Sequence, residues 1–190
     1  YDDLQSATRI ADMLTNFEII WIVKGAWEWW ARSLCNRSIL ANASDLKSFH
    51  VINDMIKMRD FRMPFAPAIL EEYAHKYIKD RDIIWLKSKE SHQHMISAVD
   101  STVLAQDHLR AAIHQKDKTL RPQIVNKTNN VWMYDVLQKF SEKTWMWWVM
   151  NTSLNIHGYP LVWTLEQALF TLDNSWMHNL LLGNYLIIKK

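Results

Sequence analysis

One carboxylate and one imidazole in the sequence have the spacing of a metal site. Glu72 and His75 stand three positions apart, and on a helix this spacing places both side chains on one face. Helical bundles that bind two iron ions use two such Glu-x-x-His pairs and further glutamates from two other helices. The sequence has only this one pair, and Glu71 and Glu72 are also ordinary surface partners of a histidine. We therefore predict no metal site and no cofactor, and keep a metal-binding or haem-binding bundle as an alternative.

The other residues with catalytic potential form no familiar motif. None of the 8 histidines has the i, i+4 spacing of a zinc-protease helix, and the scattered His50, His75, His157 and His178 are equally available as haem ligands. Cys35 has an apolar sequence neighbourhood with Arg32 and Arg37 as its nearby cations, so we expect a buried, unreactive thiol. With 3 glycines and 1 cysteine, the chain has no phosphate-binding glycine loop, no Gly-x-Ser-x-Gly and no cysteine-based zinc site. These absences favour a protein that is not an enzyme.

Tryptophans are the most unusual feature of the composition, with 11 in the chain. A buried indole needs a partner for its N–H group, so some of them should lie at a surface or a pocket. Trp27 and Trp30 would share one helix face while Trp29 would not, and the later cluster repeats this arrangement. We predict binding residues in both clusters, with simple partial exposure as the alternative: Trp27, Trp29, Trp30, Trp145, Trp147 and Trp148.

Length and composition favour one helical domain. The chain has 190 residues, of which 49% are hydrophobic, and its formal net charge is +2. A net charge so close to zero shows no excess of positive residues that would favour binding to nucleic acid. Because glycine and proline are scarce (3 and 4 residues) and alternating apolar and polar runs are absent, we predict an all-α fold. The predicted architecture is a single bundle of five or six long, mainly antiparallel helices spanning residues 1–190.

Capping residues and apolar stripes place these helices along the chain. The first would begin at Asp2 or Asp3 and reach Cys35, and within it 17–30 would be a central buried helix too short for a membrane span. A polar connection over 114–130 is the best candidate hinge. The other helices are expected from Ser44 through Ile56 and Phe61 to Pro64, from Pro67 to Leu86, up to Ile113 with or without a break at Ser91, from Asn130 through Trp148, and from Pro160 to Leu180.

Four Asn-x-Ser/Thr triplets lie in segments expected to be loops or helix ends. They begin at Asn36, Asn42, Asn126 and Asn151. Such triplets are acceptors for N-glycosylation, and they also arise by chance where asparagine, serine and threonine form turns. The start of the chain has no basic segment followed by an apolar one, so a targeting peptide is absent or already removed.

Two eleven-residue segments resemble late-helix segments of type I interferons. They are QDHLRAAIHQK, residues Gln106–Lys116, and VWTLEQALFTL, residues Val162–Leu172. The resemblance covers 22 of 190 residues, and the chain departs from the family in its long first helix and in its single cysteine, which cannot form the usual disulfides. It implies a secreted helical signalling protein.

The function predicted from the residues is that of a non-enzymatic binding or scaffold bundle. Its Trp-rich apolar surface or cavity would take a protein partner, an apolar small molecule or a second copy of the chain. The alternatives are a designed bundle without biological activity, the signalling protein, and the metal or haem bundle. A designed bundle would favour alanine, glutamate, lysine and leucine on its helix surfaces, whereas this chain is rich in tryptophan, asparagine, histidine and methionine.

Overall fold

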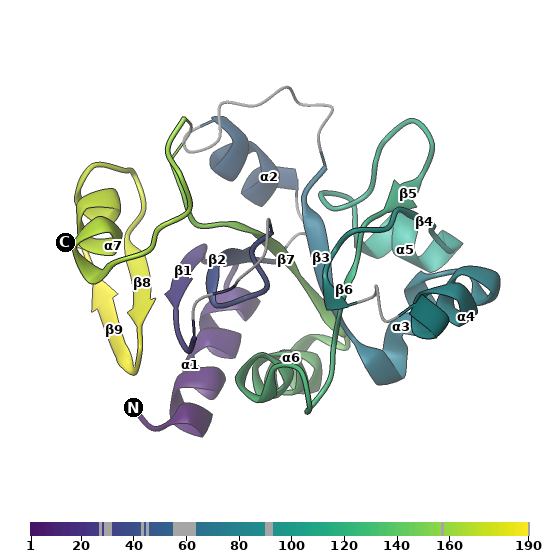
Figure 1. Cartoon of the computed structure of the whole chain (residues 1–190), viewed down its shortest axis with the longest axis horizontal. Coiled ribbons are helices and arrows are strands. Elements are labelled where there is room, and N and C mark those ends of the chain that lie inside the picture. Colours follow the sequence, from purple (N-terminus) through teal and green to yellow (C-terminus); the bar gives the residue numbers. More distant parts are fainter. Residues whose placement is uncertain are drawn as a thin grey trace.

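A seven-stranded mixed sheet runs through the described part of the chain, with helices on both faces (Figure 1). The computed structural model describes residues 1–26, 28, 32–42, 44, 46–54, 64–89, 93–156 and 158–189. The strands of this sheet are β1 (Ile20–Val23), β2 (Arg37–Ala41), β3 (Ala66–Leu70), β6 (Gln123–Val125), β7 (Trp148–Ser153), β8 (Asn179–Leu182) and β9 (Tyr185–Ile188). Their spatial order is β6-β3-β7-β2-β1-β8-β9. The pairs β1–β8 and β3–β6 are parallel, and the other neighbours are antiparallel.

Two long helices cover one face of the sheet and lie side by side (Figure 1). They are α1 (Asp3–Thr15) and α6 (Val131–Thr144), and their apolar residues share one core with the strands below them. Shorter elements contribute to a second core on the opposite face. These elements are α2 (Leu46–Ile52), α3 (Ala74–Tyr77), α5 (Val103–His108), α7 (Leu165–Asp173) and the small sheet of β4 (Val99–Asp100) and β5 (Thr119–Leu120). The 3-10 helix η2 (Glu71–Tyr73) and α4 (Asp80–Lys89) flank α3.

This architecture overturns the prediction of an all-α bundle of long antiparallel helices. In β1, Ile20 and Ile22 belong to the core under α1 and α6, whereas Trp21 and Val23 belong to the core on the other face. A strand that is buried on both faces is apolar at every position, so its sequence cannot be distinguished from that of a buried helix by periodicity. The segment 17–30, predicted as a central helix, therefore contains strand β1.

The scarcity of glycine also misled the prediction, because other residues adopt the left-handed backbone conformation. Among the described residues, φ is positive at all three glycines and at five others, which are Phe17, Cys35, Met95, Lys118 and Trp145. Such non-glycine positions are uncommon and carry no simple sequence signal. Phe17 follows the end of α1 and Trp145 follows the end of α6, so both helices end where the sequence shows no glycine.

Two helix starts predicted from capping residues are confirmed. The Asp2 carboxylate accepts a hydrogen bond from the backbone N–H of Gln5 at the start of α1. The side-chain oxygen of Asn130 accepts one from Met133 at the start of α6. Both caps depend only on a side chain and the backbone two or three residues later, so they can be predicted without knowing the rest of the fold.

The predicted helix ends are wrong. The first helix, α1, ends at Thr15 instead of Cys35. The helix predicted from Asn130 through Trp148 is α6, which ends at Thr144. Pro67 lies in β3, where a helix was expected, and the last helix begins at Leu165 rather than Pro160 and ends at Asp173. The predicted hinge over 114–130 contains β5 and β6. The predicted core positions Ile56 and Phe61 and the possible cap at Ser91 lie outside the described residues.

That residues 1–190 form one domain stays a prediction. Of the helices in the described ranges, none combines the length and the apolar content that crossing a membrane requires.

Candidate functional site

The three tryptophans of the later cluster occupy three different environments. Trp27, Trp29 and Trp30 lie outside the described residues. Trp145 follows α6 and is 76% exposed, whereas Trp148 begins β7 and is 1% exposed. Trp147 stacks on the Tyr73 ring at 4.3 Å between centroids, with the Lys76 ammonium 3.7 Å from its own centroid. The later three tryptophans therefore do not share one surface, and their binding role stays a prediction.

The Glu-x-x-His pair does not sit on one helix. Glu72 belongs to η2 and accepts a hydrogen bond from the Tyr134 hydroxyl at 2.9 Å, while His75 is an exposed residue of α3. Within the described ranges, no three histidine, cysteine, aspartate or glutamate side chains are close enough together to hold a metal ion.

Two of the four Asn-x-Ser/Thr triplets form turns, whereas the triplet that begins at Asn151 lies in strand β7, where a loop or helix end was expected. The side-chain oxygen of Asn126 accepts hydrogen bonds from the backbone and hydroxyl of Thr128, and Asn42 forms the same pair of contacts with Ser44. Asn42 and Asn151 are each 1% exposed, so neither can accept a glycan in the folded protein.

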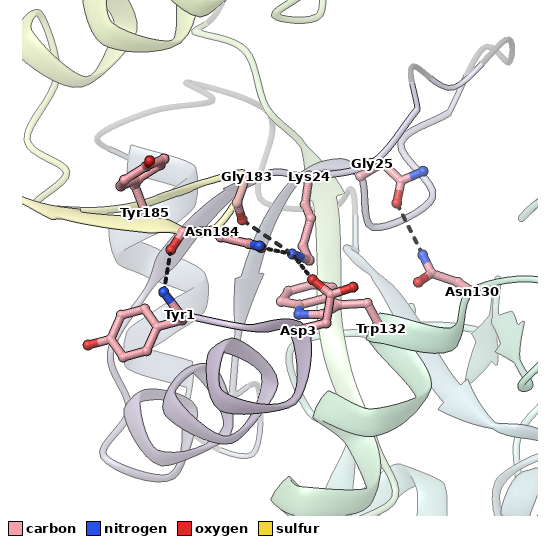
Figure 2. Close-up of a pocket in the computed structure, with 10 residues that line it drawn as sticks. Tyr1, Asp3, Lys24, Gly25, Asn130, Trp132, Gly183, Asn184 and Tyr185 are labelled. Atoms are coloured by element: carbon pink, nitrogen blue, oxygen red, sulfur yellow. Dashed lines mark hydrogen bonds and ion pairs between the residues drawn. The ribbon is translucent and has the colours of Figure 1, made fainter.

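One cavity is built around a lysine that is already paired with a carboxylate. It encloses about 700 Å³ between the start of α1, the end of β1 and the β8–β9 turn, as Figure 2 shows. The Lys24 ammonium lies 2.8 Å from the Asp3 carboxylate and donates to the side-chain oxygen of Asn184 at 2.5 Å and the carbonyl of Gly183 at 3.3 Å. The Asp3 carboxylate offsets the charge of the Lys24 ammonium, which weakens the attraction of this lysine for an anion.

A smaller cavity of about 150 Å³ has the opposite balance of charge. Its described lining contains two arginines and no carboxylate. The described residues of this lining are Arg32, Ser33, Pro64, Phe65, Ala66, Met95, Arg121, Asn151, Thr152 and Ser153. Arginine matches the geometry of phosphate and carboxylate groups because its guanidinium presents several N–H donors in one plane. We call this the arginine cavity, and it is the candidate functional site.

A buried polar network forms the floor of the arginine cavity. The Asn151 side-chain amide donates to the carbonyl of Ser33 at 2.9 Å and to Gln123 Oε1 at 2.8 Å. Because Nδ2 faces two carbonyl oxygens, the orientation of this amide is fixed. Asn151 Oδ1 is buried and has no hydrogen-bond partner among the described residues. A buried acceptor without a partner is costly, so this atom is suited to receive an N–H or O–H donor from a bound molecule.

Cys35 belongs to the same network, in surroundings that disfavour its thiolate. Its thiol donates to Gln123 Oε1 at 3.1 Å and is completely buried, which confirms the expected burial. Burial raises the pKa of Cys35 well above its ordinary value, and the negative charge of Glu28 acts in the same direction. A thiol with so high a pKa has almost no thiolate at neutral pH.

Glu28 holds the loop from which Arg32 emerges. Its Oε1 accepts hydrogen bonds from the backbone N–H groups of Leu34 at 2.7 Å and Asn36 at 2.6 Å. Burial raises the pKa of this carboxyl, although these two hydrogen bonds and the Arg37 charge oppose the shift. The two contacts fix the backbone that follows Arg32, so Glu28 positions one wall of the arginine cavity.

Sequence reasoning missed the residues that define this site. In the sequence, Arg32 stands out only as a cation near Cys35, and Asn151 only as the start of an Asn-x-Ser/Thr triplet. Arg32, Arg121 and Asn151 stand far apart in the chain and meet because β2 pairs with β7, and β7 with β3. No spacing within the sequence records such a meeting.

Comparisons with known proteins identify relatives along nearly the whole chain. Residues 11–189 match the model of a family described as Carbamoyltransferase C-terminus. An uncharacterized protein of Methanocaldococcus jannaschii is 36% identical over 180 residues, covering 95% of this chain and 28% of that protein. Nodulation protein NolO of Bradyrhizobium diazoefficiens is 30% identical over 189 residues, covering 100% of this chain and 33% of that protein.

A third relative is named for its reaction. The 3'-hydroxymethylcephem-O-carbamoyltransferase of Amycolatopsis lactamdurans is 24% identical over 180 residues, covering 93% of this chain and 32% of that protein. The chain spans about a third of the length of the curated relatives it matches.

Solved structures share the fold. Full-length HypF in its phosphate- and nucleotide-bound form superposes with a TM-score of 0.64 at 17% identity, covering 96% of this chain and 25% of HypF. Sua5 of P. abyssi complexed with L-threonine gives a TM-score of 0.61 at 12% identity, covering 95% of this chain and 47% of that one. Both matches agree with the mixed α/β architecture.

These findings correct the predicted function. A non-enzymatic binding or scaffold bundle is wrong, and so are the designed bundle, the signalling protein suggested by the interferon resemblance, and the metal or haem bundle. The prediction that the chain is not an enzyme is wrong too, because its relatives include named O-carbamoyltransferases and point to an enzyme-like protein. The chain belongs to the carbamoyltransferase C-terminus family.

Proposed function

We propose that the arginine cavity binds the anionic carbamoyl donor of a carbamoyl-transfer reaction. The observation that carries this proposal is the combination, in one cavity, of two arginines with Asn151 Oδ1, which has no hydrogen-bond partner in the described part of the chain. A donor in which a carbamoyl group is esterified to phosphate has both complementary parts. Its phosphate would accept hydrogen bonds from Arg32 and Arg121, and its amide would donate one to Asn151 Oδ1.

The names of the relatives and neighbours support a donor of this kind. The Amycolatopsis relative is named an O-carbamoyltransferase, which requires a carbamoyl group in an activated form. HypF, which shares the fold, has been solved in a phosphate- and nucleotide-bound form. Sua5 has been solved with L-threonine, which carries a carboxylate. The phosphate and nucleotide of the HypF structure and the carboxylate of L-threonine are anionic groups of the kind that a pocket with two arginines would bind.

Placing the donor here would also favour its reaction. A guanidinium that binds phosphate stabilises the charge that grows on this group as it leaves the carbamoyl carbon. Asn151 is 1% exposed, and hydrogen bonds to such a desolvated group are stronger than those made in water. The cavity would thus both select the donor and make phosphate a better leaving group.

The binding of carbamoyl phosphate, measured by calorimetry, tests this proposal. We expect Arg121→Ala to weaken binding roughly 10- to 100-fold, the amount expected for the loss of one charged hydrogen-bonding group. Arg110→Ala is the matched control, because Arg110 is a surface arginine that pairs with Asp107 at 2.7 Å, outside the arginine cavity. Equal affinities for wild type and Arg121→Ala would contradict the proposal.

A second proposal concerns Trp145 alone and is independent of the arginine cavity. Trp145 is the exposed member of the later cluster, so it is the one available for contact with a protein partner or a second copy of the chain. Substitution of Trp145 by alanine would then abolish partner binding with little loss of fold, measured by sedimentation and circular dichroism.

A further inference from the structure

Large apolar side chains gather on the surface of one short stretch of the chain. Within residues 163–176, five of them are between 37% and 74% exposed, and we call this group the α7 surface: Trp163, Leu165, Leu169, Phe170 and Trp176. Single exposed apolar residues are ordinary in a folded protein, whereas several together mark a site of contact with another surface. The α7 surface is therefore a candidate interface.

Helix α7 presents an apolar face to solvent. In this helix, only Ala168, Thr171 and Leu172 are buried. Leu165 and Leu169 stand four positions apart, so they share one face, and that face is exposed. A helix at a protein surface usually has charged and polar residues on its outward face, and a helix that is apolar all round is buried. The composition of α7 is thus typical of a helix packed on two sides, of which the described residues cover one.

Two carboxylates lie within this apolar face. Glu166 and Asp173 are seven positions apart, which is about two turns of a helix, and both are exposed. In the described part of the chain, neither side chain forms an ion pair. The Lys189 ammonium donates instead to three backbone carbonyls at the end of the helix. A partner with lysine or arginine around an apolar centre would complement this face.

The same carboxylates argue against a second copy of the chain as the partner. In a symmetric dimer, each subunit presents the same patch to the other. Glu166 and Asp173 would then face their counterparts, and like charges that are brought together repel. The partner that fits is one whose face differs from the α7 surface.

The α7 surface lies away from the arginine cavity. In Figure 1, α7 is at the left end of the molecule beside β8 and β9, whereas α3 and α4 are at the right end. None of the five residues of the α7 surface lines the arginine cavity. A partner on α7 and a donor in that cavity would therefore occupy different parts of the molecule.

The lengths of the relatives identify the partner. Nearly all of this chain matches only about a third of each of three relatives, and the matched family is described as a C-terminus. We propose that the α7 surface docks against the remaining part of a carbamoyltransferase, through a face of apolar side chains flanked by lysine or arginine. The proposal needs the family membership and not the donor site, so the two can fail separately.

A graft into a full-length relative tests this interface. The uncharacterized protein of Methanocaldococcus jannaschii is 36% identical over 180 residues, so this chain can replace the matching segment of that protein. Phe170→Cys and, separately, Leu165→Cys each supply one reactive thiol, because Cys35 is completely buried. A maleimide should modify each introduced thiol about 10-fold or more slowly in the graft than in the chain alone, since the core of an interface excludes water. Mass spectrometry of the labelled peptide measures the rate.

An exposed isoleucine provides the matched control. Ile84 belongs to α4, at the other end of the molecule in Figure 1. Ile84→Cys should react at the same rate in the graft and in the chain alone. Leu169→Lys, added to Phe170→Cys, places a charge in the apolar centre, so it should restore rapid modification in the graft. Cys35 should stay unmodified in every graft that has folded.

The relative without a graft gives a second measurement, which does not depend on the folding of the graft. Hydroxyl radicals should oxidise its side chains aligned with α7 less than those aligned with residues 80–84, each normalised to the unfolded protein. Equal modification of Phe170→Cys in graft and chain, or stronger oxidation of the segment aligned with α7, would overturn the proposal. Protection that rises with the concentration of the chain alone would also overturn it, because a second copy would then cover α7. Failure to bind carbamoyl phosphate would contradict the proposed function instead.

Discussion

The cavity around Lys24 and the arginine cavity both contain cations, and they differ in what surrounds them. The former is larger, at about 700 Å³ against about 150 Å³, yet its lysine contacts the Asp3 carboxylate and an amide oxygen. The described lining of the latter has two arginines and no carboxylate. The comparison teaches that volume does not identify an anion site, because the balance of charge in the wall decides whether an anion gains by entering.

The largest effect should come from adding a carboxylate to each cavity in turn. Ser153→Asp places a negative charge in the wall of the arginine cavity, and Asn184→Asp places one beside Lys24. Like charges about 4 Å apart near a protein surface repel by about 4 kcal/mol, so Ser153→Asp should weaken carbamoyl phosphate binding by about 100-fold or more. Asn184→Asp should leave it unchanged. Calorimetry on both variants checks the contrast, and equal losses would remove the distinction between the cavities.

A smaller effect, on stability alone, should follow from Lys24→Ala. Lys24 is buried and holds the start of α1 to the β8–β9 turn through Asp3, Asn184 and Gly183. Losing these contacts should lower the free energy of unfolding by about 1–2 kcal/mol. The ion pair with Asp3 contributes little to this loss, because Asp3 is exposed and solvent screens the interaction. Urea denaturation measures the loss. Weaker donor binding in this variant would mean that the Lys24 cavity takes part in donor recognition.

The smallest expected effect concerns Glu28 and pH. Burial raises the pKa of its carboxyl above the ordinary value of 4.5, so the folded state favours the protonated form. The stability linked to this shift is present below pH 4.5 and is lost as the pH rises through the raised pKa of the folded state. Wild type should therefore lose stability relative to Glu28→Gln, which mimics the protonated carboxyl, as the pH rises through this window. Urea denaturation of both proteins across this range gives the difference, and a relative gain by wild type would refute the assignment.

The helix starts were predicted correctly from the sequence because they depend on contacts between neighbouring residues. The caps at Asp2 and Asn130 need only a side chain and the next backbone N–H groups, and both are present as expected. The strands were missed because residues such as Ile22 and Trp21 face opposite cores, so no polar face remained to reveal a period of two.

The candidate site could not be predicted from the sequence because its residues lie far apart along the chain. Arg121 and Asn151 meet only after β3 has paired with β7 and with β6, and the sequence carries no mark of these pairings. Cys35 illustrates the limit well. Its burial is predicted by its apolar sequence neighbourhood, but its contact with Gln123 depends on the fold of the whole sheet.

The location of bound carbamoyl phosphate is the measurement that most directly tests the account. A crystal structure of the protein with this donor should show the phosphate against Arg32 and Arg121 and the carbamoyl amide donating to Asn151 Oδ1. The Lys24 cavity should then contain no donor. A phosphate bound at Lys24, with the arginine cavity unchanged, would contradict the central claim that the balance of charge in the wall selects the site.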